Sequence, residues 1–119
     1  MNYNLIDKGD KRYIECISNE ILISKETDAM DLIAACFENN TNLLIIHYEA
    51  LSEDFFNLRT GLAGAILQKL VNYNIKVAII IANEENLNDR FREMIIEANK
   101  RDDYRAFKSI TDAENWILT

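Results

Sequence analysis

Two short apolar segments constrain the fold of this chain more than any other feature. They span residues 43–47 and 75–81, and their only polar residues are His47, at the end of the first, and Lys76, near the start of the second. Each segment is too short for a core helix, and an apolar run without alternation is typical of a strand that is covered on both faces. Strands of this kind belong to parallel sheets, so we expect an α/β domain.

The segments around these two strands predict the remaining elements. Apolar residues recur at three- and four-residue spacing after Thr27, from about Thr60 and from about Asn88 to Lys100, which predicts three amphipathic helices. A short turn of helix is expected near 53–58. The pattern at 111–114 resembles a capping box in which Thr111 and Glu114 open a terminal helix that docks Trp116.

The two ends of the chain predict the edges of the sheet. Residues 3–7 and 11–17 flank Gly9, which can take the positive φ of a tight turn, so they predict an antiparallel hairpin. Residues 104–108 predict a last, edge-like strand. The complete order is β-β-α-β-α-β-α-β-α, in which strand and helix alternate as in right-handed parallel crossovers. The chain has no proline and no linker-like stretch, so we expect one domain over 1–119.

Charge and cysteine usage exclude several classes of function. The net charge of −7 argues against sequence-independent binding of nucleic acid, which needs a concentrated basic face. No apolar run reaches the length of a membrane-spanning helix, and we expect a cytoplasmic protein. Cys16 and Cys36 are isolated in apolar surroundings, which favours buried, reduced thiols. Neither a metal site nor a cofactor is indicated.

Several stretches of the chain carry a family resemblance. They include residues 46–49, 53–56, 60–64 and 97–100, together with 58–67 and 113–118. With this element order, the chain resembles the SpoIIAA-like (STAS-like) domains and, within that group, the bacterial DUF4180 family of unknown function. In the anti-sigma-antagonist relatives, phosphorylation of a serine at the start of the second helix switches binding to a kinase partner. Thr60, preceded here by Arg59 and followed by Gly61, holds the corresponding position, and whether Thr60 or Ser52 is phosphorylated stays open.

The expected topology predicts a binding surface where the parallel strands end. Ligands of open α/β sheets bind beyond the carboxyl ends of the strands. A histidine beside carboxylates can serve as an oriented base, an arginine can hold an anion, and exposed aromatic rings can anchor a protein partner. No nucleophile stands at a telling spacing, so no catalytic residue is assigned. The candidate binding residues are His47, Glu49, Asp54, Phe55, Phe56, Arg59, Thr60 and Gly61.

Individual side chains of this surface have specific expected roles. Glu49 or Asp54 would orient His47, and one ring of the pair Phe55 and Phe56 would be exposed as an anchor. The small residues Gly61, Ala63, Gly64 and Ala65 would let the second long helix approach the sheet closely.

Three functions are compatible with these features. The leading hypothesis is a non-catalytic regulatory module that binds a protein partner through the surface from His47 to Thr60. The alternatives are a protein that binds a small anionic molecule, or a weak enzyme, at the same surface, and an acidic inhibitor of a nucleic-acid-binding protein. The oligomeric state does not follow from the sequence.

Overall fold

The computed structural model describes residues 3–17 and 23–119. Within these ranges the chain forms a five-stranded sheet with the order β1-β2-β3-β4-β5. The strands are β1 (Asn4–Lys8), β2 (Lys11–Cys16), β3 (Leu43–His47), β4 (Lys76–Ile80) and β5 (Tyr104–Phe107). β1 pairs with β2 in antiparallel fashion and all other pairings are parallel. The α/β sheet and its opening hairpin, with Gly9 at φ +70°, confirm the sequence prediction.

The connections between the strands are helical. The longer helices are α1 (Asp28–Glu38), α3 (Leu62–Asn72), α4 (Asp89–Ala98) and the terminal α5 (Ile110–Ile117). The short helix α2 (Glu53–Phe56) lies between β3 and α3, with the single-turn 3-10 segments η1 (Tyr48–Ala50) before it and η2 (Leu58–Thr60) after it. A third such segment, η3 (Glu84–Asn86), lies between β4 and α4. Each long helix begins within two residues of its predicted start.

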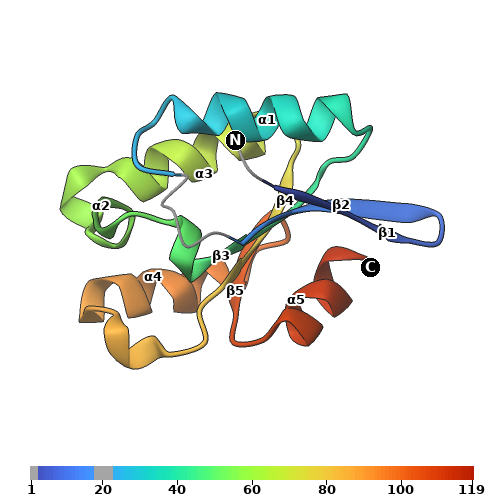
Figure 1. Cartoon of the computed structure of the whole chain (residues 1–119). Helices are drawn as coiled ribbons and strands as arrows, with labels where there is room; N and C mark the ends of the chain where they lie inside the picture. The colour runs from blue at the N-terminus through green and yellow to red at the C-terminus, as the bar shows by residue number, and fades with distance from the viewer. Residues whose placement is uncertain (1–2, 18–22) are drawn as a thin grey trace.

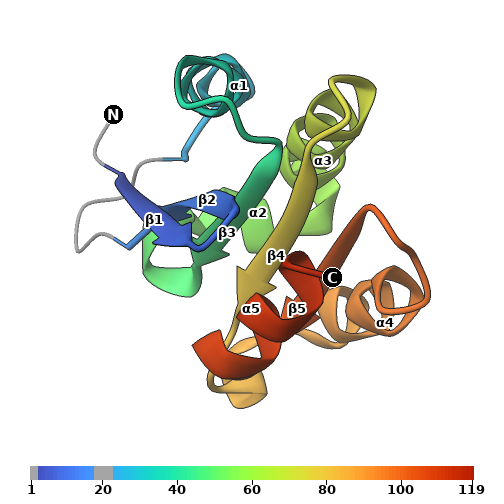
Figure 2. The same ribbon diagram turned by 90° about the vertical axis from the view of Figure 1, so that its right-hand side faces the viewer.

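The order of the strands decides which face of the sheet the helices cover. Each strand lies beside the one before it in the chain, so right-handed crossovers all fall on one face. Figure 2 shows α1, α3 and α4 on one side of the sheet and α5 on the other. The terminal helix α5 therefore covers the second face of the sheet.

Alternation along the strands divides the core into two clusters. Leu44 and Ile46 of β3 pack in the cluster with α1, α3 and α4, whereas Ile45 packs with Ala113 and Ile117 of α5. Successive side chains of a strand point to opposite faces, so one apolar strand supplies both clusters. This arrangement explains why residues 43–47 and 75–81 are apolar apart from His47 and Lys76.

The start of α5 differs from the predicted capping box. Ser109 is its N-cap, and the Ser109 hydroxyl accepts a hydrogen bond from the amide of Asp112. Glu114 instead accepts a hydrogen bond of 2.6 Å from the hydroxyl of Tyr13 in β2. A tertiary partner thus replaces the local role that the spacing of Thr111 and Glu114 suggested.

Lysines hold the carboxyl end of α5 against the sheet. Lys11 and Lys76 donate to the backbone carbonyls of Leu118 and Trp116, respectively. Lys76 also lies 4.4 Å from the centre of the Trp116 ring. The last carbonyls of a helix lack partners within the helix and carry negative partial charge, so cations on β2 and β4 complement them. Trp116 is half-buried and docks as the sequence predicts.

Candidate functional site

The predicted binding surface lies where β3 ends. His47 is the last residue of β3, and residues 48–61 lead from it to the start of α3, which returns toward the amino ends of the strands. β3 and β4 are parallel and in direct register, with Leu44 opposite Val77. His47 and Thr60 therefore both lie at the carboxyl edge of the sheet, and α2 marks this edge in Figure 1.

Both phenylalanines of the 48–61 segment are buried. Phe55 is 1% exposed and Phe56 is 9% exposed, so the expectation that one ring stands exposed as an anchor is wrong. Phe56 stacks on Tyr48 at 4.7 Å between ring centres and meets Phe91 of α4 edge-on at 5.0 Å. The rings fill the core beneath the segment, because a connection of this length needs apolar contacts to hold one shape.

Hydrogen bonds fix the second half of the segment. The Thr60 hydroxyl lies 2.7 Å from the carbonyl of Asp54 and accepts a hydrogen bond from the amide of Leu62. Asn88, the N-cap of α4, donates to the carbonyl of Phe56 and ties the segment to the next connection. The exposed charged side chains of the segment therefore project from a held backbone.

Gly61 is the residue at which the chain turns into α3. Its φ of +76° lies in the left-handed region, and it takes the N-cap position of α3 without a side chain. Ala63 is buried and packs in the core under α3, whereas Gly64 is exposed and faces open space. The expectation that all the small residues serve helix-to-sheet packing is wrong, because a helix has an outer face as well.

His47 is paired with a carboxylate that is not among the predicted binding residues. His47 Nε2 lies 2.9 Å from Oε2 of Glu15 in β2, and their side chains are only 17% and 10% exposed. Glu49 and Asp54 are the expected orienters, but both are exposed and neither is within hydrogen-bond distance of the ring. The signal that could have found Glu15 is its place as the single charge within Tyr13–Ile17, an otherwise apolar stretch.

The histidine and Thr60 are associated with opposite faces of the sheet. His47 shares the side-chain direction of Ile45, which packs under α5, because residues two apart in a strand point the same way. Arg59 and Thr60 instead lead into α3, on the other face. The single surface predicted at the carboxyl edge is thus divided into the acid–histidine pair and the 48–61 segment.

The neighbourhood of His47 offers little for catalysis. Among the described residues, its one hydrogen-bond partner is Glu15, and no hydroxyl or thiol forms a hydrogen bond with the ring. Cys16 follows Glu15 in β2 but points to the other face of the sheet, and burial raises the pKa of its thiol to about 12. Burial likewise raises the pKa of Cys36 to about 11. Both cysteines are free and buried, as predicted, and both stay protonated at neutral pH.

The strand order bears on where a ligand could bind. In open α/β sheets, ligands bind where the strand order reverses and neighbouring connections part to opposite faces. The order here follows the chain without reversal, and the connections part only after β4 and β5 in the described residues, because α4 and α5 cover opposite faces (Figure 2). A hollow of about 240 Å³ at the carboxyl edge lies between Asn57–Arg59 and Asn88–Arg90. A second hollow of about 240 Å³ is lined by Ile81 and Phe107 at the ends of β4 and β5, and both are open to solvent. Drug-sized ligands usually occupy roughly 300–1,000 Å³.

Two further structural findings concern ions and membranes. No three acidic, histidine or cysteine side chains are grouped to hold a metal ion in the described residues. Over the same residues, no helix is both long and apolar enough to cross a membrane.

The comparisons with known proteins identify a family and no characterised relative. Neither a curated protein nor a solved structure matches the chain. The family model described as "Domain of unknown function (DUF4180)" matches residues 8–117, which include every strand but the first and all the helices. This match covers most of the chain, and the protein therefore belongs to the DUF4180 family of domains of unknown function.

Proposed function

We propose that this chain is a non-catalytic regulatory module, STAS-like in type, which binds another protein through its 48–61 segment. The observation that carries the proposal is a fixed polar surface on buried aromatic supports. Glu49, Glu53, Asp54 and Arg59 are exposed on a backbone that is held by Phe55, Phe56 and the Thr60 hydroxyl.

A held surface of this kind favours recognition of a protein. Binding by a mobile loop costs conformational entropy each time the loop is ordered, and a pre-organised segment avoids most of that cost. Three of the four charges are carboxylates, so the partner should present basic side chains with an acidic group opposite Arg59. Among the described residues, no hydroxyl or thiol forms a hydrogen bond with His47, which supports binding over catalysis.

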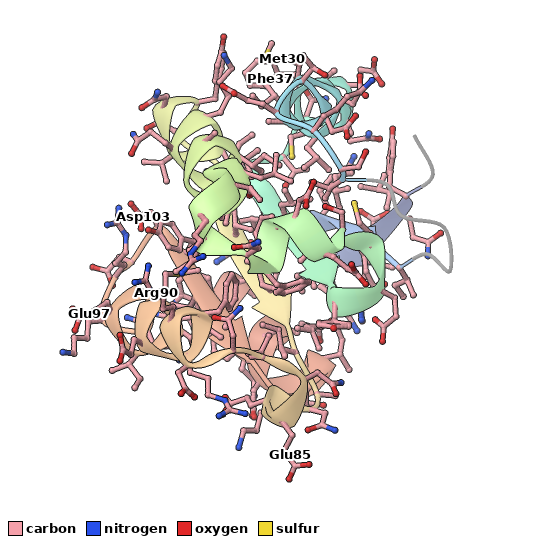
Figure 3. All side chains as sticks on the ribbon, turned by 90° about the vertical axis from the view of Figure 1, so that its left-hand side faces the viewer. Met30, Phe37, Glu85, Arg90, Glu97 and Asp103 are labelled. Atoms are coloured by element: carbon pink, nitrogen blue, oxygen red, sulfur yellow. The ribbon has the colours of Figure 1, made fainter. Side chains whose placement is uncertain are left out.

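Charge reversal on the segment tests this proposal. The full chain is used to capture proteins from its native host, beside the variant Glu53→Lys/Asp54→Lys/Arg59→Glu. The matched control, Glu84→Lys/Glu85→Lys, reverses two exposed carboxylates after β4 (Figure 3). We expect the unaltered chain and the control to capture the same partner protein. The segment variant should capture at least tenfold less of it, and circular dichroism should show that each variant is folded.

The result that overturns the proposal is equally specific. If the segment variant captures the same proteins in the same amounts, the 48–61 segment is not the contact surface. If no protein is enriched over an unrelated acidic domain by any of the three baits, the chain is not an interaction module of the proposed kind.

Binding of a small anion is the second candidate, and one observation favours it. Arg59 and Arg90 line the same hollow, and neither forms an ion pair with a described residue. Two guanidinium groups suit phosphate or carboxylate. Inorganic phosphate should then raise the melting temperature of the chain at constant ionic strength, and Arg90→Ala should remove the rise. An equal rise in the variant excludes this site.

A further inference from the structure

Helix α1 carries large apolar side chains on its outer side as well as on its inner side. Its inner side is buried against the sheet and α3, with Leu32, Ile33 and Cys36 in the core. On its outer side, Met30 is 43% exposed and Phe37 is 59% exposed. Figure 3 shows both side chains on the side of α1 that faces away from the sheet. Large apolar side chains that are exposed together in one patch mark a contact surface.

The outer surface of α3 extends this face with few charges. Its exposed positions are Gly64, Gln68 and Asn72, its half-exposed ones include Ala65, and Lys69 is its one charged residue. At the end of α3, the ring of Tyr73 is 41% exposed and meets Phe37 edge-on, with 6.1 Å between ring centres. The face therefore runs across both helices, and we call the outer surfaces of α1 and α3 together with Tyr73 the α1/α3 face.

The helix α4 shows what a solvated outer surface looks like in this protein. Over ten residues α4 carries five charged side chains, all outside the core, and its exposed Ile96 stands alone among them. Arg90 and Glu97 project from it in Figure 3. By contrast, the charged side chains on the outside of α1 and α3 are Asp31, Glu38 and Lys69. The α1/α3 face is thus an exception on a strongly charged surface.

We propose that a second copy of this chain covers the α1/α3 face in a two-fold dimer. A two-fold contact pairs one surface patch with itself, so the patch must be self-complementary. When α1 of one copy lies over α3 of the other, Asp31 and Glu38 of the first copy lie near Lys69 of the second. The two-fold axis repeats this contact at the other pair of helices. Placing α1 over α1 would instead oppose carboxylates, which disfavours that arrangement.

The net charge of the chain points to the same face. Two copies that each carry −7 repel one another over most of their surfaces. The α1/α3 face carries two carboxylates and one ammonium group, so it is nearly neutral and the repulsion there is weakest. Small residues at Gly64 and Ala65 allow a partner helix to approach α3 closely, while Met30 and Phe37 supply apolar contact area.

The mass of the chain in solution tests the dimer directly. Sedimentation equilibrium of the full chain over roughly 1–300 µM, a range that spans typical weak association, should show a mass rising to twice that of one chain. Phe37→Glu and Met30→Glu should each shift the midpoint to at least tenfold higher concentration. Ile96→Glu introduces the same charge at an equally exposed isoleucine of α4 and should leave the midpoint unchanged. Circular dichroism and thermal melting check that each variant folds.

Charge exchange tests the arrangement of the helices. Lys69→Glu should weaken the dimer, and combining it with Asp31→Lys and Glu38→Lys should restore it. If that combination fails to restore the dimer, the proposed α1-over-α3 pairing is wrong. A chain that stays monomeric throughout the range, or a dimer that Phe37→Glu leaves intact, overturns the proposal. The test of the dimer does not depend on the test of partner capture, because the α1/α3 face and the 48–61 segment share no residue.

Discussion

Single residues at the carboxyl edge have roles that their types alone do not reveal. Phe55 and Phe56 are supports of the 48–61 segment, and Thr60 is a brace whose hydroxyl ties Asp54 to Leu62. Glu15 and His47 satisfy one another on the α5 face of the sheet. A polar group that is buried with a partner contributes to the free energy of unfolding mainly because its removal leaves the partner unsatisfied.

The pair of Glu15 and His47 should show strong energetic coupling. We expect Glu15→Ala or His47→Ala to lower the free energy of unfolding by about 1–3 kcal/mol, since each leaves a buried polar partner behind. The free energy of unfolding lost in the double variant should be smaller than the sum of the two single losses by about 1 kcal/mol or more. Urea unfolding of the four proteins measures this cycle, and strict additivity would mean that the two side chains do not interact in solution.

The two buried thiols should make the protein less stable at alkaline pH. Burial raises the pKa of Cys16 to about 12 and that of Cys36 to about 11, whereas both start near 9 in an unfolded chain. Above about pH 9, the unfolded chain therefore releases protons that the folded chain still holds. The free energy of unfolding then falls as pH rises, by about 2–3 kcal/mol at pH 10 for both thiols together.

Denaturant unfolding at pH 7, 9 and 10 under reducing conditions measures this loss. The variant Cys16→Ala/Cys36→Ala serves as the control, because it lacks both thiols and should show a shallower decline between pH 9 and pH 10. Equal slopes in the two proteins would show that the thiols do not ionise differently on unfolding.

At the scale of elements, the start of α3 depends on one backbone conformation. Gly61 takes a φ of +76° while a Cβ there would meet no other atom, so the restriction is conformational and not steric crowding. Gly64 lies three residues later, within α3, where it is exposed to solvent and a Cβ would likewise meet no other atom. The two glycines therefore form a matched pair in which only the backbone conformation differs.

Alanine substitutions at these two glycines should change stability in opposite directions. Gly61→Ala should lower the free energy of unfolding by about 1–2 kcal/mol, the cost of a left-handed conformation for an L-residue. Gly64→Ala should raise it by about 0.5–1 kcal/mol, because alanine restricts the unfolded chain and favours the helix. Thermal or urea melts of the two variants decide this, and a stabilising Gly61→Ala would exclude the left-handed turn.

At the scale of the molecule, one sheet joins two core clusters. The cluster under α1, α3 and α4 and the cluster under α5 are made of alternate residues of the same strands, such as Leu44 and Ile45. Loss of either cluster exposes one face of β3 and β4, which weakens the strands that the other cluster needs. The described part of the chain should therefore unfold as one cooperative unit.

Two spectroscopic probes test this cooperativity. Trp116 is the single tryptophan of the sequence and packs with Phe107 in the α5 cluster, so its fluorescence reports on that face. Far-ultraviolet circular dichroism reports on all the helices, most of which cover the other face. The two urea transitions should coincide in midpoint and slope, and an earlier fluorescence transition would show that α5 detaches on its own.

Most of the secondary structure could be predicted from the sequence because local physics determines it. Short apolar runs without alternation marked β3 and β4, Gly9 marked the hairpin turn, and the period of apolar residues marked α1, α3 and α4. The burial of Cys16 and Cys36 followed from their apolar neighbours. These features need only the preferences of a few adjacent residues, together with the need to bury apolar side chains.

The tertiary structure alone decided which distant residues meet. It paired His47 with Glu15 and Tyr13 with Glu114, turned both phenylalanines of the 48–61 segment inward, and left Met30 and Phe37 outside. These outcomes depend on the order of the strands, which sets the faces that α1, α3, α4 and α5 cover. Different strand orders are compatible with the same local sequence patterns. Local patterns in a single sequence therefore do not distinguish one strand order from another.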